Sequence, residues 1–334
     1  METKRSYNID LAKTIAYIGV VFLHVVGKAT ENGYSGSIAG QILYNLGTLA
    51  VPMFFVVNGY LLFGKKSVSY KYSGIKIMNI LGVILGWNIL YAILYFVAKH
   101  KIKNPVVLTY NNLLQKEFFY QFWFMGSLII CYLLLPILNN IWHRRFKAFI
   151  GIFLVALIVS LCFDIRNIMV GGSPIQENII QTFRIWTWFM YYILGGIIKK
   201  INSNKQLPIF NPAISIIMVV GMLIYEYFIK YRYHTGFAEY NYDNLLIILT
   251  VTVVFIAILN LKIPHKFNTT ILFLSQNGFG VYVLHIIFLK AIGKLLNLTN
   301  IWQNILGLLV VLIGSYLLTY IISKIKFLKK LVFR

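Results

Sequence analysis

The chain has 334 residues, of which 59% are hydrophobic and 12% are charged, and its formal net charge is +22 at pH 7. Soluble domains have about 50% apolar and about 25% charged residues, so this composition excludes an ordinary soluble globular protein. Contact with lipid explains the excess of apolar side chains. A charge of this size is also typical of nucleic-acid-binding proteins, which makes the placement of the basic residues important.

Apolar runs long enough to cross a bilayer, which takes about 20 residues, recur along the whole chain. They predict about ten transmembrane helices near residues 9–27, 41–63, 77–98, 119–141, 148–165, 183–201, 212–230, 244–262, 270–292 and 301–323. No long polar linker separates the runs, so we expect one all-α integral membrane domain over residues 1–334. The first run lacks a small-residue cleavage site, which argues against a cleavable signal peptide.

The basic residues are distributed unevenly between the two sides of this arrangement. If the N-terminus is inside, nineteen lysines and arginines, from Lys4 and Arg5 to Arg334, fall in cytoplasmic segments, against eleven near the outer segments. The asymmetry fits the positive-inside rule and predicts that both termini are cytoplasmic in a multi-pass protein of the cell membrane. The positive charge of these segments then determines the orientation of the protein in the membrane and favours binding to anionic lipid headgroups. No basic cluster lies on a soluble module, so we expect no nucleic-acid partner.

The first predicted helix contains three polar residues, Asp10, Lys13 and His24. Lys13 and His24 are eleven residues apart, which is close to three helical turns, so both project from nearly the same face about 16 Å apart. Charged residues inside spanning helices usually face a bundle interior or a wet cavity. Lys13 could instead extend to the headgroups, Asp10 could pair with Lys13 or cap the helix, and His24 could be hydrated near the outer interface.

Lysine or arginine, ten residues and then histidine in the first span resembles the signature of membrane-bound acyltransferase family 3. Other segments are similar to later motifs of that family in the same order. They are VPMFFVVNGYLL (51–62), FWFMGSLIICYLLLPIL (122–138), RIWTWFMYYILGGII (184–198) and LSQNGFGVYVLHIIF (274–288). The resemblance covers nearly the whole chain. It implies transfer of an acyl group, by default acetyl, from cytoplasmic acyl-coenzyme A to a hydroxyl of a cell-envelope polysaccharide or other glycan.

The resemblance also implies roles for particular residues. His24 would be the catalytic group, either as a general base or as a covalent acyl carrier. Lys13, Lys71 and Lys76 would bind the phosphates of the donor. The alternative for Lys71 and Lys76, favoured for Lys71, is that their positive charge only determines which side of the membrane is cytoplasmic. Many relatives have two arginines three residues apart at the start of the third helix, where this chain has Lys76 and Asn79. Lysine lacks the bidentate fork of arginine, so an altered or inactive member is the alternative.

Five further residues are candidates for binding or positioning the acceptor. His285 and Tyr282 lie one turn apart on a later helix, where an interhelical hydrogen bond is the alternative role. Arg184 opens a helix beside two tryptophans that could anchor the helix at the outer interface, and Arg184 itself could contact the acceptor or have a structural role. Trp123 lies beside the predicted pore or in the aromatic belt, and Asp10 is a partner for Lys13.

Motifs of other enzyme classes are missing from the sequence: it has no Gly-x-Ser-x-Gly, no His-Glu-x-x-His and no Walker loop. We therefore expect an O-acyltransferase without a metal or a resident cofactor, with acyl-coenzyme A, in particular acetyl-coenzyme A, as a substrate. Its expected partners are membrane lipids, the glycan acceptor and the machinery of polysaccharide synthesis. Two alternatives stay open: a non-enzymatic transporter of a glycan or lipid-linked sugar, and a scaffold subunit of a polysaccharide synthase.

Overall fold

The structure is a computed structural model that describes residues 5–31, 38–208, 212–234 and 237–332. Lys4 and Arg334, which contribute to the predicted charge asymmetry, lie outside these ranges. Within them the regular secondary structure is helical throughout, with no strand. The helices of four or more residues are α1 (Tyr7–Glu31), α2 (Ile38–Leu46), α3 (Ala50–Phe63), α4 (Tyr70–Lys99), α5 (Pro105–Leu113), α6 (Trp123–Arg144), α7 (Phe146–Val170), η4 (Ile175–Asn178), α8 (Ile185–Ser203), α9 (Pro212–Tyr233), α10 (Leu245–Asn260), α11 (Asn268–Ile292), α12 (Ile301–Lys324) and α13 (Lys329–Val332).

Every predicted apolar run coincides with a helix, and the run at 41–63 forms α2 and α3 joined by the single turn η2 (Gly47–Leu49). Eight helical segments of the described chain are long and apolar enough to cross a membrane, fewer than the predicted ten. The other two runs form α8, whose tryptophans, tyrosines and two lysines lower its hydropathy, and α10, which has only 16 residues. The side on which the termini lie stays a prediction.

Several helices begin at residues whose side chains accept hydrogen bonds from the first turn. Ser69 accepts from the backbone N–H of Tyr72 at the start of α4, and Asn300 accepts from that of Gln303 at the start of α12. Asn244 caps α10 in the same way. Such caps satisfy donors that a helix leaves unpaired at its N-terminus, so they fix where each helix begins.

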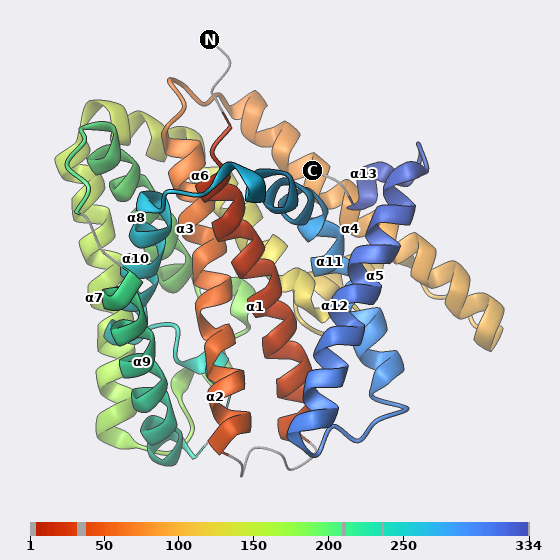
Figure 1. Cartoon of the computed structure of the whole chain (residues 1–334). Coiled ribbons are helices and arrows are strands. Elements are labelled where there is room, and N and C mark those ends of the chain that lie inside the picture. The colour runs from red at the N-terminus through yellow and green to blue at the C-terminus, as the bar shows by residue number, and fades with distance from the viewer. Residues whose placement is uncertain (1–4, 32–37, 209–211, 235–236, 333–334) are drawn as a thin grey trace.

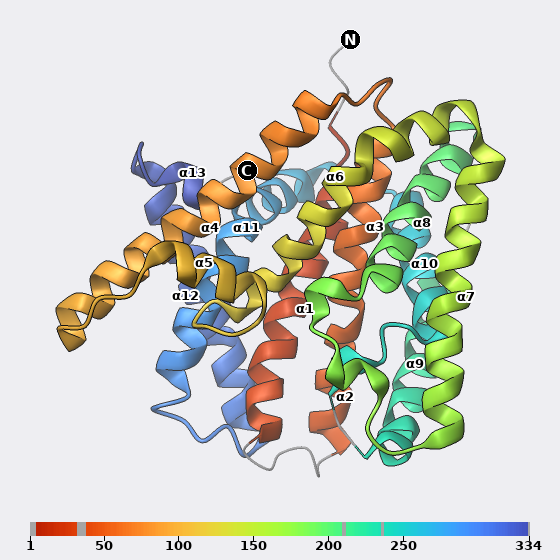
Figure 2. The same ribbon diagram turned by 180° about the vertical axis from the view of Figure 1, so that it is seen from behind.

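Helix α1 lies in the middle of the bundle (Figure 1). Helices α7 to α10 lie on one side of it and α11 to α13, with α4 and α5, on the other, as both views show (Figure 2). It packs against α3, α11 and α12. The outer helices α7, α9 and α12 carry many exposed apolar side chains, as expected for helices that face lipid. The central position of α1 places its polar residues inside the protein.

The closest helix pair is α3 and α8, which meet through glycines. A Cβ at Gly59 would lie 1.8 Å from the carbonyl oxygen of Tyr192, and one at Gly195 would lie 2.1 Å from that of Val56. Neither position can hold a larger side chain without moving the backbones apart, as is common where membrane helices touch. Because the ring of Trp123, a candidate site residue, lies 5.1 Å from that of Trp188 of α8, this contact also positions the site.

We expect Gly59→Ala and Gly195→Ala each to destabilise the protein by about 1–3 kcal/mol, the usual cost of overpacking. Gly82 in α4 is a matched control, since a Cβ there meets nothing within 4 Å. Gly82→Ala should be neutral or slightly stabilising, because alanine favours helix. Thermal unfolding of the detergent-purified variants measures the difference. Equal melting temperatures for all three variants would show that the α3–α8 contact is not tight.

Candidate functional site

His24 lies on the wall of a cavity of about 210 Å³ that is lined by α1 and its neighbours and by segments between the helices. The hydroxyl oxygen of Tyr120 is 3.1 Å from its Nδ1 atom, and the two rings meet edge to face. Among the described residues, the other ring nitrogen, Nε2, makes no hydrogen bond. The imidazole is therefore held by one nitrogen and has the second available for chemistry.

The cavity wall combines aromatic rings with a few polar groups. Besides His24 it is formed by Val20, Leu23, Gly27, Tyr44, Val51, Gln115, Tyr120, Trp123, Gln181, Phe237, Glu239, Tyr242 and Leu289. An apolar, largely aromatic wall with a few convergent polar groups is typical of small-molecule sites. Trp123, a predicted site residue, is on this wall, whereas Arg184, His285 and Tyr282 are not.

His285 of α11 lies beside His24, and Tyr282 lies one turn before it on the same helix. The ring centres of His24 and His285 are 5.0 Å apart, and His285 is fully buried. Nδ1 of His285 is 3.2 Å from the carbonyl oxygen of Val281, and its Nε2 has no hydrogen-bond partner among the described residues. The Tyr282 hydroxyl donates to the carbonyl of Gln121 in the segment that also carries Tyr120. The structure thus brings His285 next to His24, and the ring of Tyr282 lies 6.1 Å from that of His285.

Arg184 is buried and connects two outer segments that border the cavity. Its guanidinium donates to the carbonyl oxygens of Gln176 (2.7 Å), Ile179 (3.1 Å) and Glu239 (2.8 Å). These contacts support a structural role for Arg184, which is one of the alternatives that the sequence leaves open. Arg184 holds Gln181 and Glu239 in place on the cavity wall. Burial raises the pKa of the Glu239 carboxyl, and the nearby Arg184 opposes this shift.

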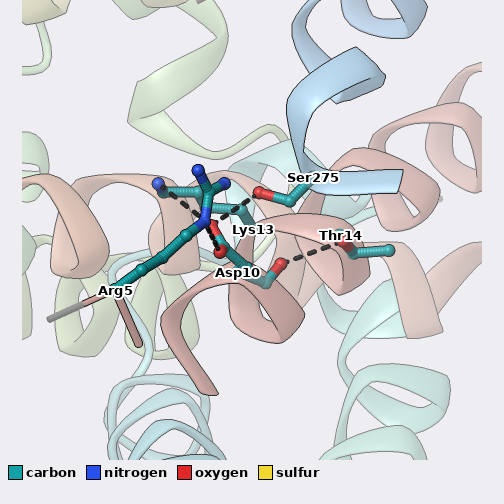
Figure 3. Close-up of polar contacts among 5 residues, drawn as sticks. All are labelled: Arg5, Asp10, Lys13, Thr14 and Ser275. Carbon is teal, nitrogen blue, oxygen red and sulfur yellow. Dashed lines mark hydrogen bonds and ion pairs between the residues drawn. The ribbon is translucent and has the colours of Figure 1, made fainter. Parts of the chain in front are cut away.

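Asp10 and Lys13 form a cluster that is separate from the cavity (Figure 3). Lys13 lies about 16 Å from His24 along the axis of α1. The Asp10 carboxylate accepts hydrogen bonds from Arg5 Nε (2.6 Å) and Ser275 Oγ (2.9 Å) and lies 3.7 Å from Lys13 Nζ. Asp10 therefore pairs with Lys13, as one of the sequence alternatives predicts, and also ties α1 to α11. It does not lie in the cavity, so an acceptor contact through Asp10 is not supported by the geometry.

Lys71 and Lys76 lie on the first turns of α4. Lys71 is exposed. Lys76 is half-buried, and its ammonium is 5.7 Å from the centre of the Tyr72 ring. Neither lines the cavity, which agrees with a prediction that separates donor-binding lysines from the catalytic histidine. Whether these lysines bind phosphate stays a prediction.

The cavity wall also contains polar residues that the sequence did not single out, among them Tyr120, Gln181 and Glu239. All three lie in short segments between the long helices, at η3 (Tyr120–Phe122), η5 (Gln181–Phe183) and η6 (Ala238–Tyr240). Tyr120 closely precedes the FWF stretch, which is the one sequence signal that could have identified it. Within the described residues, no three His, Cys, Asp or Glu side chains are grouped as a metal site requires.

Comparison with known proteins gives two findings. A family model described as an acyltransferase domain, of acyltransferase family 3, matches residues 6–324. A protein of Enterococcus faecalis named amino-acid racemase is 23% identical over 352 aligned residues, which cover 96% of this chain and 46% of that protein. The chain thus spans about half the length of that relative, whose name describes the longer protein. No solved structure matches the chain.

Proposed function

Because the chain belongs to acyltransferase family 3 over residues 6–324, we propose that it is a membrane O-acyltransferase. It transfers an acyl group, by default acetyl, from cytoplasmic acyl-coenzyme A to a hydroxyl of a cell-envelope polysaccharide or other glycan. The observation that carries the proposal is the contact of 3.1 Å between His24 and Tyr120 on the wall of the cavity. Membership of the family and the apolar helices support acyl transfer at a membrane; the donor and acceptor are parts of the proposal.

His24 acts as the general base. The Tyr120 oxygen accepts a hydrogen bond from the Nδ1–H group, and this tautomer has its lone pair on Nε2. Nε2 takes the proton of the acceptor hydroxyl while that oxygen attacks the thioester carbonyl carbon. The carbon–sulfur bond then breaks, and the imidazolium returns its proton to the coenzyme A thiolate. The product is an ester on the acceptor and free coenzyme A, with His24 neutral again.

The donor approaches from the end of α1 that carries Lys13. Lys13 and Lys76 bind its phosphates, and the thin pantetheine arm spans the distance of about 16 Å to His24. The net charge of the Arg5, Asp10 and Lys13 cluster is positive, which suits an anionic ligand. The acceptor enters the cavity from the opposite end. In this arrangement α1 carries both Lys13, which binds the donor phosphates, and His24, which takes the proton.

Mass analysis of envelope glycans from cells with and without the gene tests the function. We expect acyl substituents to disappear when the gene is deleted and to return when it is restored. Glycans that are unacylated in both strains, but whose export depends on the gene, would instead identify a transporter.

Tyr120→Phe tests whether Tyr120 orients the ring of His24. Removing one neutral hydrogen bond changes a free energy by about 0.5–1.5 kcal/mol, so we expect kcat to fall about 2- to 10-fold with little change in the KM for either substrate. Tyr110→Phe is the matched control, because Tyr110 is an exposed tyrosine of α5. The rate of radiolabelled acyl transfer by purified protein measures both variants. An unchanged kcat for Tyr120→Phe would show that Tyr120 does not orient the base.

A further inference from the structure

Among the described residues, the cavity beside His24 has a single acidic residue on its wall, Glu239. We propose that Glu239 and Gln181 bind the acceptor by accepting hydrogen bonds from its hydroxyls, so that the unit acylated is a neutral or amine-bearing sugar and not an acidic one. This inference rests on the proposed function and adds to it the residues and the charge class of the acceptor.

The side chain of Glu239 has no direct partner for its carboxylate among the described residues. It forms no ion pair and no side-chain hydrogen bond with them, although the Arg184 guanidinium is close. The reason is that Arg184 donates to three backbone carbonyl oxygens, among them the carbonyl of Glu239 itself. A carboxylate away from bulk water needs hydrogen-bond donors, and a ligand in the cavity can supply them.

Gln181 provides independent evidence for a ligand at the same wall. Its side chain is 2% exposed, and its Oε1 atom has no hydrogen-bond partner within the described part of the chain. Leaving a buried acceptor unpaired is unfavourable, so such atoms usually have a reason in the function of a protein. Glu239 and Gln181 both lie on the wall of one cavity, and each has an oxygen that can accept a hydrogen bond. The complementary ligand therefore carries several donors, as a sugar does, and an anionic group would be repelled.

The size and the remaining wall of the cavity agree with one sugar unit. A volume of about 210 Å³ corresponds to about seven waters and is smaller than the pockets that hold drug-sized ligands. The rings of Tyr44, Trp123 and Tyr242 offer flat apolar surface for the C–H face of a sugar. We expect one sugar unit to occupy the cavity beside His24, so the charge of that unit decides whether the glycan is accepted.

The test is acyl transfer by purified full-length protein from radiolabelled acetyl-coenzyme A to glycan extracted from cells that lack the gene. In Glu239→Gln a charge-assisted hydrogen bond becomes a neutral one, so we expect the KM for the glycan to rise about tenfold. The KM for acetyl-coenzyme A should not change. Gln181→Met removes an acceptor oxygen at similar volume and should raise the glycan KM about 3- to 10-fold. If Glu239→Gln does not fold, the glycan KM of Gln181→Met tests the proposal by itself.

Glu177→Gln is the matched control, since Glu177 is an exposed acid of η4 that does not line the cavity. Mass analysis of the product should place the acyl group on a sugar without a carboxylate or phosphate. Transfer by the wild type with an unchanged glycan KM in both cavity variants, or acylation of a uronic acid, would overturn the assignment of Glu239 and leave the acyltransferase itself intact. No transfer by the wild type would overturn the proposed function and this inference with it.

Discussion

His24→Ala is expected to lower the rate of acyl transfer by about 10²–10⁴-fold, the usual contribution of a general base, and by more if the imidazole carries the acyl group. The protein should still be inserted at normal levels. Within the described residues the His24 side chain makes one hydrogen bond, to Tyr120, and interhelical hydrogen bonds in membranes contribute on average only about 0.6 kcal/mol. The measurement is the initial rate with purified protein, together with its yield and thermal unfolding.

His24→Gln separates proton transfer from hydrogen bonding. Glutamine can still contact Tyr120 but cannot take a proton at neutral pH, so we expect a loss almost as large as with alanine. His285→Ala is the matched control on the facing helix, since it removes the neighbouring imidazole 5.0 Å away. We expect a milder loss, because His285 does not line the cavity. Near-normal transfer by His24→Gln would exclude the mechanism proposed here.

The helices could be predicted from the sequence because an uninterrupted apolar run of about 20 residues is rarely needed by anything but a membrane-spanning helix. The count of spans was harder to predict for a physical reason. Trp188, Tyr191 and Tyr192 bury α8 in the bundle. Because this helix packs against protein, its extent is determined by that packing and not by the hydropathy of its residues. α10 is likewise packed against protein, through a buried face that includes Ile247 and Phe255.

The candidate site could be predicted only where a helix carries the signal. The spacing of Lys13 and His24 is a property of one helix, and His285 and Tyr282 share another. Tyr120, Gln181 and Glu239 reach the cavity from short segments whose positions depend on tertiary contacts, such as those of Arg184. No periodicity of the sequence encodes those contacts. The resemblance to a family supplied the role of His24, which spacing alone left open.

Lys76→Glu is expected to raise the KM for acyl-coenzyme A by about 30-fold or more. A unit charge about 4 Å from a phosphate contributes about 1 kcal/mol even at the dielectric constant of water, and reversing it turns that attraction into an equal repulsion. The swing of about 2 kcal/mol is therefore a lower limit for a half-buried residue. The kcat at saturating donor should change little, because Lys76 does not line the cavity with His24.

Lys66→Glu distinguishes this effect from a change in topology. Lys66 is exposed in the turn before α4, and its reversal removes the same positive charge from the side predicted to be cytoplasmic. Donor titrations of both variants, at equal amounts of purified protein and with the wild type alongside, measure the two KM values. A large rise for Lys76→Glu with a small one for Lys66→Glu supports a phosphate site at the start of α4. Equal effects in the two variants, or none in either, would assign Lys76 to topology alone and move the donor site to other residues.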